Sequence, residues 1–329
     1  MQILASFLLS FALHLALVLG SVDPLITVDG LSSGGYMATQ YQVAFSSSVR
    51  GAAIFASGPY YCAEAILSNA LGRCMNGLTT IPVSNLLSYA SRQSGLGLID
   101  PVSNIAGHSV FLFSGTLDAT VKPVVVKSLE EMYKAWGVSN IKAVFDFSAA
   151  HTMPTLNYGN LCTVSSAPFI SKCNYDGAGE ALQHLYGGSL ADPGTAINSN
   201  IIQFDQSDFT PNGVSPASIS MDTVGYAYIP SGCKPGSGGS CRLHVSFHGC
   251  KQYYDTIGMA YVENAGYNRW AETNNIIVLY PQTIASSFLP SNPNGCWDWW
   301  GYVDASYALK RGPQMATVNN IVNYFINNY

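Results

Sequence analysis

The sequence predicts an α/β domain built on a mainly parallel β-sheet. Three observations lead to this fold class: short runs rich in β-branched and aromatic residues recur along the chain, helical patterns alternate with them, and neither a repeat nor a long linker divides the chain. With 329 residues, the chain is long enough to form one large domain with a sizeable core.

Seven segments have the pattern of buried strands. Each is dominated by apolar residues and bounded by polar or Gly-rich stretches, at residues 25–29, 51–57, 109–115, 141–147, 223–230, 242–249 and 275–282. Amphipathic patterns predict helices over residues 37–45, 123–136 and 261–272. The Gly-, Ser- and Asn-rich residues 60–104 and 152–222 are expected to form irregular surface segments.

Charged residues are scarce. Asp, Glu, Lys and Arg make up 10% of the chain and the net charge is −5, whereas apolar residues make up 48%. A disordered protein would need more charge and less apolar content. A nucleic-acid-binding protein would show a basic patch, and a coiled coil would show Glu/Lys-rich heptads. We therefore expect a globular protein with no nucleic-acid partner.

The N-terminus predicts export. Residues 3–19 form a nearly unbroken apolar run, and the small residues Gly20 and Ser21 follow it. This pattern indicates a cleaved signal peptide over residues 1–20, followed by a single domain over residues 21–329. A membrane anchor is the alternative. No later run approaches the length that spans a membrane, so we expect a secreted, extracellular protein that is free of the membrane. We also expect a monomer.

Eight cysteines agree with an oxidising compartment. No Cys/His cluster has the spacing of a zinc site, so we expect neither a metal ion nor another cofactor. Buried free thiols are the alternative to disulfides. The spacings suggest four local disulfides, one hypothesis among many possible pairings: Cys62–Cys74, Cys162–Cys173, Cys233–Cys241 and Cys250–Cys296.

The strongest catalytic signal is the segment Gly30-Leu31-Ser32-Ser33-Gly34, which fits the pattern G-x-S-x-G. It lies between a predicted strand and a predicted helix, the context that a nucleophile elbow needs. In such an elbow the serine sits on a strained turn at the helix N-terminus. Ser32 is therefore the predicted nucleophile, and the backbone N–H of Ser33 is a predicted oxyanion donor. An ordinary Gly/Ser turn is the alternative.

A nucleophilic serine needs a base and an acid that orients the base. Asp118 and His151 each follow a predicted strand, and the chain order Ser, Asp, His is that of the α/β-hydrolases. We predict a triad of Ser32, Asp118 and His151. His108 and His184 follow no predicted core strand, so we expect them at the surface.

The second oxyanion signature stands late in the chain. In α/β-hydrolases the second donor N–H comes from a loop after an early strand, often marked His-Gly. Here His248-Gly249-Cys250 closes a predicted strand some two hundred residues after Ser32. The simplest explanation is a circularly permuted α/β-hydrolase fold, in which the N–H of Cys250 is the second donor. A simple strand-end turn is the alternative.

Three tryptophans in the segment Cys296-Trp-Asp-Trp-Trp300 suggest an apolar substrate wall. Trp297 stands next to the suggested Cys250–Cys296 bridge, and we expect it to line the cleft. Trp299 and Trp300 are explained as well by burial in the core.

Several long motifs together resemble the extracellular poly(3-hydroxybutyrate) depolymerases, specifically the single-domain, circularly permuted fungal kind. They are GLSSGGYM, the loops of Asp118 and His151, NYDGAG, LHVSFHGC, GYNRWAETNNIIVLYPQ and NPNGCWDWWGY. The resemblance implies a secreted serine esterase that cleaves solid polyester to short 3-hydroxyacid oligomers without a cofactor. It also implies the triad, oxyanion donors, cleft tryptophan and four disulfides named above.

Two other functions stay open at this stage. One is a feruloyl or acetyl esterase that acts on plant polysaccharides, and the other is a catalytically dead homologue that binds a polymer. The low charge has a candidate use in the depolymerase. Few charges lower the desolvation cost of contact with an insoluble polyester. Tyr60, Tyr61, Tyr253 and Tyr254 are candidate contact residues.

Overall fold

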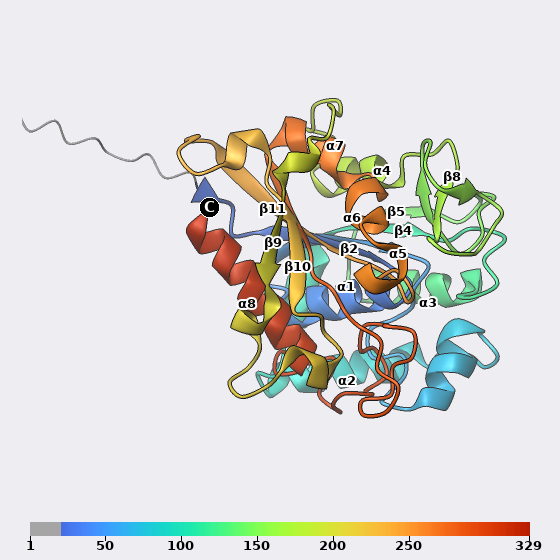
Figure 1. Cartoon of the computed structure of the whole chain (residues 1–329). Coiled ribbons are helices and arrows are strands. Elements are labelled where there is room, and N and C mark those ends of the chain that lie inside the picture. Colours follow the sequence, from blue (N-terminus) through green and yellow to red (C-terminus); the bar gives the residue numbers. More distant parts are fainter. Residues whose placement is uncertain (1–20) are drawn as a thin grey trace, which may run out of the picture.

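The computed structural model describes residues 21–329 (Figure 1), so the predicted signal peptide at 1–20 lies outside the described residues. Its centre is a sheet of nine strands within this range, in the order β5-β4-β3-β2-β11-β12-β10-β9, with β1 also paired to β11. The bounds are β1 Ser21–Val22, β2 Ile26–Leu31, β3 Val49–Phe55, β4 Ser109–Phe113, β5 Asn140–Val144, β9 Ile201–Asp205, β10 Val224–Tyr228, β11 Ser240–Phe247 and β12 Ile276–Tyr280.

The sheet is mainly parallel. Every pair from β5 to β12 is parallel, and only β10 and β9 join in antiparallel fashion at one side. Parallel strands are usually covered on both faces, which explains why the inner strands are buried at nearly every position. The strand β2 is buried at all six positions.

Helices cover both faces of the sheet (Figure 1). One core lies between the sheet and α1, α2, α3 and α8, and the other lies beneath α4, α6 and α7. Alternate strand residues face the two cores, as Ile54 and Phe55 of β3 do. The helix bounds are α1 Ser33–Ala44, α2 Val83–Gly95, α3 Pro123–Ala135, α4 Gly177–Leu185, α5 Tyr254–Ile257, α6 Ala260–Asn264, α7 Tyr267–Asn274 and α8 Pro313–Asn328. Within residues 21–329, no helix combines the length and the apolar character that crossing a bilayer requires.

All seven predicted strands are present, with ends shifted by a few residues, and the mainly parallel sheet flanked by helices is confirmed. The predicted helix 261–272 is two helices, because Gly266 has a φ of 105° between α6 and α7. The expectation of irregular structure in 60–104 and 152–222 is wrong in part. Those segments contain α2, α4, the edge strand β9 and a small sheet of β6 (Met153–Thr155), β8 (Ile170–Lys172) and β7 (Asn160–Leu161).

Two of these elements, α2 and β9, were missed because their exposed faces hide the pattern. In α2 only Leu86, Ala90 and Gln93 are buried, and Ser, Asn and Arg side chains fill the other faces. In β9 no residue is fully buried, so its alternation is weak. Tertiary packing decides such segments more than local propensity does.

Four disulfides join the pairs that the spacing suggested, and the described chain has no free cysteine. Three of them close short loops of 8 to 12 residues at the surface. The fourth, Cys250–Cys296, spans 46 residues and ties the loop after β11 to the segment that carries the tryptophans.

The strands β2 and β11 are parallel neighbours, although about two hundred residues separate them along the chain. Thr27 is opposite His244, and Gly30 is opposite Phe247. Both strands therefore end at the same edge of the sheet. This order agrees with a circularly permuted arrangement, in which the strand before the His-Gly loop enters late but lies beside the strand before Ser32.

A buried polar network joins these two strands beneath α4 and α7. His244 Nε2 lies 2.9 Å from Asp29 Oδ1, and His244 Nδ1 lies 2.8 Å from Thr27 Oγ1. Tyr267 donates its hydroxyl to Asp29 Oδ2 at 2.5 Å, and the Tyr186 hydroxyl lies 3.0 Å from Thr27 Oγ1. The imidazole and the carboxylate are completely buried. A neutral ring that donates from Nε2 and accepts at Nδ1 satisfies every member.

We expect His244→Leu to lower the free energy of unfolding by about 2–3 kcal/mol, because a buried carboxyl oxygen of Asp29 then loses its hydrogen-bond donor. Urea unfolding followed by circular dichroism measures this change. Tyr280→Phe is the matched control, since it removes one buried hydroxyl that donates to Asn268 on the same face, and it should cost only about 1 kcal/mol. Equal losses in the two variants would mean that the hydrogen bond from His244 to Asp29 stabilises the fold no more than the bond of the Tyr280 hydroxyl does.

Candidate active site

Ser32 stands on a strained turn between β2 and α1. Its backbone has a φ of 58° and a ψ of −122°, a conformation that a residue with a side chain rarely adopts. The Ser32 N–H donates to the carbonyl of Phe55 at 2.9 Å, which holds the turn against the neighbouring strand. The Ser32 side chain is half-buried and lines a cavity at the carboxyl edge of the sheet.

Two glycines make this turn possible. A Cβ atom on Gly30 would lie 2.2 Å from the carbonyl carbon and oxygen of Gly34. A Cβ atom on Gly34 would lie 2.1 Å from the carbonyl oxygen of Phe247, at the end of β11. Because neither clash can be relieved by rotating a side chain, these positions require glycine. The second close approach brings the start of α1 next to the loop that follows β11.

His151 and Asp118 form a buried pair. His151 Nδ1 lies 2.8 Å from Asp118 Oδ2, and both side chains are almost completely buried. Asp118 Oδ1 accepts hydrogen bonds from the N–H groups of Thr120 and Val121, at 2.8 and 2.9 Å. A carboxylate with these donors keeps the Nδ1–H tautomer of the imidazole and leaves Nε2 as the free acceptor. An imidazole oriented in this way can take a proton from a hydroxyl.

Ser32 and His151 lie in the wall of one cavity of about 340 Å³, together with Cys250. The structure thus brings together the predicted nucleophile, base and acid from the loops after β2, β5 and β4. Among residues 21–329, no hydrogen bond joins the Ser32 hydroxyl to the His151 ring. In substrate-free active sites this contact is often long and tightens only when substrate binds.

The two predicted oxyanion donors lie near each other at this edge. The Ser33 N–H is the first of α1, where helix geometry provides no acceptor. The Cys250 N–H belongs to the loop after β11, which lines the cavity. Within the described part of the chain, neither N–H donates to a protein acceptor. Both are therefore free to receive a ligand oxygen.

The sequence reasoning did not assign roles to His248 and Gln252, which hold this loop. His248 Nδ1 donates to the carbonyl of Gly249 at 2.8 Å, and Gln252 Oε1 accepts from the Gly249 N–H at 2.7 Å. Gln252 also donates to the carbonyls of Pro168 and Phe169, at 2.9 and 3.1 Å. Because C=O and N–H point in opposite directions in a trans peptide, fixing the Gly249 carbonyl fixes the direction of the Cys250 N–H.

The tautomer of His248 is set by its surroundings. Burial lowers the pKa of His248 to about 4, so the ring is neutral near pH 7. Its Nε2 accepts from the N–H of Thr283 at 3.2 Å, which leaves the proton on Nδ1 for the Gly249 carbonyl. The His-Gly pair itself is visible in the sequence. The role of His248 in holding the Gly249 carbonyl depends on the burial of its ring, which the sequence does not show.

The placement of Trp297 in the cleft is wrong. Trp297 is completely buried and packs edge-on against Phe247, with ring centroids 5.1 Å apart. The Cys250–Cys296 bridge draws Trp297 beneath the loop after β11 rather than into the cavity. Asp298, which accepts N–H groups from residues 301–303, then turns the chain back toward the surface.

Trp299 and Trp300 take the place expected of Trp297. They line a second, largely apolar cavity of about 530 Å³ together with Leu67, Leu71 and Leu289. This cavity adjoins the first, since three residues line both: Met75, Cys250 and Asn294. The Trp299 ring also stacks on Tyr36 of α1, at a centroid distance of 4.0 Å.

The other histidines lie away from this site. The expectation of an exposed His108 is wrong, because the ring is buried between Ser46 and Gln42. Its burial lowers the His108 pKa. His184 is half-buried in α4 and lies near the carbonyl of Asn140.

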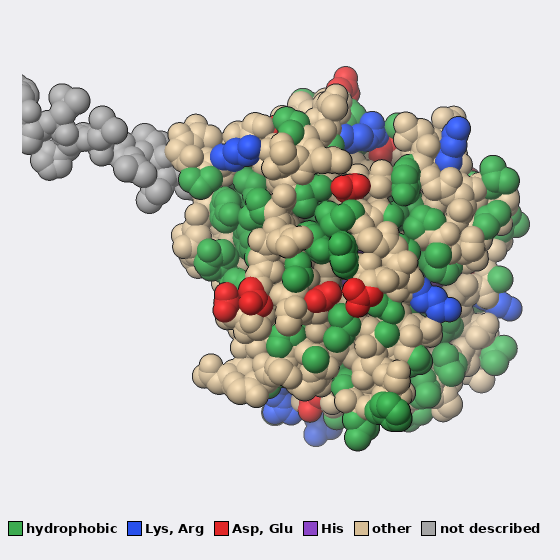
Figure 2. All heavy atoms as spheres, in the orientation of Figure 1, with side chains coloured by type: hydrophobic (Ala, Val, Ile, Leu, Met, Phe, Trp, Pro, Cys, Tyr) green, Lys and Arg blue, Asp and Glu red, His purple; other side chains and the backbone are tan. Residues whose placement is uncertain are grey.

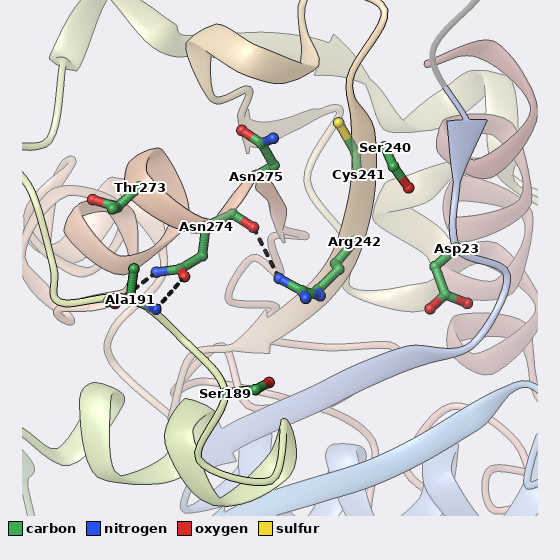
Figure 3. A pocket seen from close by; sticks show the side chains of 9 residues that line it. All are labelled: Asp23, Ser189, Ala191, Ser240, Cys241, Arg242, Thr273, Asn274 and Asn275. Carbon is green, nitrogen blue, oxygen red and sulfur yellow. Dashed lines mark hydrogen bonds between the residues drawn. The ribbon is translucent and has the colours of Figure 1, made fainter.

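A separate polar cavity of about 500 Å³ opens at the opposite edge of the sheet (Figure 3). Arg242 and Ser240 at the start of β11 line it together with Asn274 and Asn275, just before β12. It contains none of the predicted catalytic, oxyanion or substrate-binding residues, and the disulfide cysteine Cys241 is the one predicted residue in its lining. Ligands of open parallel sheets bind at the carboxyl ends of the strands, so the edge that carries Ser32 is the candidate active site.

Comparisons with known proteins identify the family. No family model matches the chain. "Polyhydroxybutyrate depolymerase" of Talaromyces funiculosus is 38% identical over 321 residues, which are 92% of this chain and 90% of the relative. The chain belongs to the polyhydroxybutyrate depolymerase family. "Poly(3-hydroxybutyrate) depolymerase" of Delftia acidovorans is 46% identical over 300 residues, 90% of this chain, but the chain spans only 58% of that relative's length.

Two solved structures of polyhydroxybutyrate depolymerases have the same fold as this chain. The crystal structure of the Penicillium funiculosum enzyme matches with a TM-score of 0.84 and 36% identity, over 95% of this chain and 99% of that one. A serine-to-alanine variant of a PHB depolymerase, complexed with R3HB trimer, matches with a TM-score of 0.85 and 36% identity over the same shares. These matches confirm the α/β-hydrolase fold expected for the family.

The depressed pKa of His248 makes stability depend on pH. The folded state holds this pKa at about 4, whereas an unfolded chain has about 6.5. The unfolded chain binds more protons between these values, so the free energy of unfolding should rise with pH across this window, by about 3 kcal/mol from this residue. Urea unfolding of the wild type and His248→Gln at several pH values measures it. The variant should show a shallower rise between pH 4 and 6.5, and identical slopes would refute the assignment.

Proposed function

We propose that this protein is a serine esterase that hydrolyses poly(3-hydroxybutyrate)-type polyesters to short 3-hydroxyacid oligomers. The observation that carries the proposal is the oriented His151–Asp118 pair, which shares a cavity with a serine on a strained strand-to-helix turn. Membership of the depolymerase family supports the substrate class. The relative complexed with R3HB trimer supports it further.

The proposed reaction is a two-step acyl transfer. His151 Nε2 takes the proton of the Ser32 hydroxyl as its oxygen attacks the ester carbonyl, and Asp118 stabilises the imidazolium. The N–H groups of Ser33 and Cys250 bind the oxyanion. When the ester C–O bond breaks, His151 gives its proton to the departing hydroxyl. Water then attacks the acyl-enzyme by the same sequence and releases a carboxylate. This chemistry needs no cofactor.

The surface around the site suits contact with an uncharged solid. On the face that Figure 2 shows, charged side chains of both signs are scattered, and most of the surface between them is apolar or uncharged. At the apolar cavity, Leu67, Leu71 and Leu289 are each at least half exposed, and Leu289 is 95% exposed. Of the four tyrosines we expected, Tyr60 is buried, Tyr61 and Tyr253 are half-buried, and Tyr254 is exposed but lines neither cavity. The exposed leucines of the apolar cavity are therefore better candidates for adsorption beside the site.

We also propose that the protein is secreted, with residues 1–20 as a signal peptide and residues 21–329 as one catalytic domain that acts as a monomer. The four disulfides support an oxidising compartment. The one large sheet, with a core on each face, supports a single domain.

Ser32→Ala tests the catalytic proposal. We expect it to lower kcat on a poly(3-hydroxybutyrate) emulsion by about 10⁴-fold or more, because the acyl-enzyme cannot form. Turbidity loss and chromatography of the released oligomers measure the reaction. Ser57→Ala is the control, since that buried hydroxyl has no partner and its loss should change kcat little. Unchanged hydrolysis by Ser32→Ala refutes the mechanism, and faster release of ferulate from feruloylated xylan than of oligomers from the polyester refutes the substrate.

Leu289→Ser tests adsorption. In the Ser32→Ala background, where the polymer stays intact, we expect about a tenfold weaker binding isotherm on polymer particles, because the polymer can no longer cover this side chain. Leu289→Ser alone, with Ser32 intact, should hydrolyse a soluble short-chain ester at a rate within about twofold of the wild type. Leu96→Ser is the control, since Leu96 is exposed but lines neither cavity. Equal losses for Leu289→Ser and Leu96→Ser speak against a localised adsorption surface.

A further inference from the structure

The cavity that holds Ser32 and His151 contains one formal charge near pH 7. Of its twelve lining residues, Lys251 is the one that belongs to the Lys, Arg, Asp and Glu types. The adjoining cavity with Trp299 and Trp300 is lined by no Asp, Glu, Lys or Arg. In a chain with only 14 Lys and Arg residues, a cation beside the reacting serine calls for a reason.

The backbone of Lys251 is fixed in an unfavourable conformation. Its φ is 61°, which glycine adopts without strain and lysine does not. Its N–H donates to the carbonyl of Asn294 at 2.8 Å, and Asn294 lines the same cavity. On either side it is held by the disulfide of Cys250 and the buried Gln252. The side chain therefore starts from a rigid point next to a proposed oxyanion donor.

No local carboxylate neutralises this lysine. Lys251 takes part in none of the salt bridges found in residues 21–329. The carboxylate nearest to the reaction, Asp118, already accepts from His151 and from two backbone N–H groups. Lys251 is exposed and lines the cavity without a paired carboxylate, so it is available to an anionic group that enters, with an attraction that water and salt weaken.

The chemistry of the substrate offers one group to such a field. The interior of a polyester chain is neutral, and each hydrolysed bond yields one hydroxyl and one carboxylate. Resting on the proposed function, we propose that Lys251 is a specificity residue that binds the terminal carboxylate of 3-hydroxyacid oligomers. The enzyme then cleaves soluble oligomers with a free acid end faster than equally long neutral esters.

The test compares the trimer of 3-hydroxybutyrate with its methyl ester, which differs only in the charge of the end group. We expect Lys251→Met to lower kcat/KM for the acid trimer by about five- to tenfold in low salt, and for the methyl ester by less than about twofold. Lys251→Arg, which keeps the charge, should retain the preference. Lys234→Met is the matched control, because Lys234 is an exposed lysine in the loop before β11, away from the site.

A salt series on the wild type tests the same inference without a variant. The preference for the acid trimer should disappear between about 10 mM and about 1 M salt, where the screening length falls from about 30 Å to about 3 Å. Equal changes for both trimers in Lys251→Met, or a wild-type preference that salt leaves unchanged, would overturn the role of Lys251. If the wild type cleaves neither trimer and leaves the polymer intact, the proposed function itself fails.

Discussion

The register between β2 and β11 decides whether this site exists at all. The proposed nucleophile follows one strand, a proposed oxyanion donor follows the other, and only the pairing of the strands brings them together. A slip of one residue would turn every side chain of β11 to the opposite face. Thr27, Asp29 and His244 form a buried polar network at this seam. Apolar residues there would avoid the free-energy cost of removing polar groups from water. In some proteins a buried polar group fixes one arrangement at a cost in stability, and here such a network joins the two strands that meet at the seam of the permuted sheet.

The site inherits its rigidity from this seam. Gly34 lets α1 start against the carbonyl of Phe247, the last residue of β11. From there, Gln252 accepts from the N–H of Gly249 and His248 donates to its carbonyl, and the Cys250–Cys296 bridge holds the next residue. An N–H group that is already aimed before substrate arrives costs no reorganisation during reaction, and such preorganisation is a large part of catalysis by oxyanion holes. Without the correct strand register, the loop that these contacts hold would not lie beside Ser32.

The features that were predictable from the sequence are those with local signals. The strands are short apolar runs, the elbow is a pattern flanked by glycines, and Asp118 and His151 each stand directly after a strand. The errors arise where distant packing decides. Trp297 and Trp299 are tryptophans of the same short segment, so the sequence alone does not distinguish their positions. The bridge at Cys296 buries Trp297 beneath the loop, and the turn around Asp298 brings Trp299 to the cavity wall. The partners of Gln252, two carbonyls more than eighty residues away, could not be predicted without the fold.

The low charge of the chain and the lysine in the cleft address two stages of one proposed reaction. A neutral polymer segment loses little hydration on contact with an uncharged surface, so scarce charge and the apolar wall of Trp299, Trp300 and Leu289 favour adsorption. Each cleavage then creates a carboxylate, which an apolar wall binds poorly because the anion must give up its water. Lys251 stands where the catalytic and apolar cavities meet, next to Cys250, which lines both. An unpaired cation at that junction binds the new carboxylate but not the neutral ester. The interior of the polymer and the acid end of an oligomer are therefore bound by different parts of the same cleft.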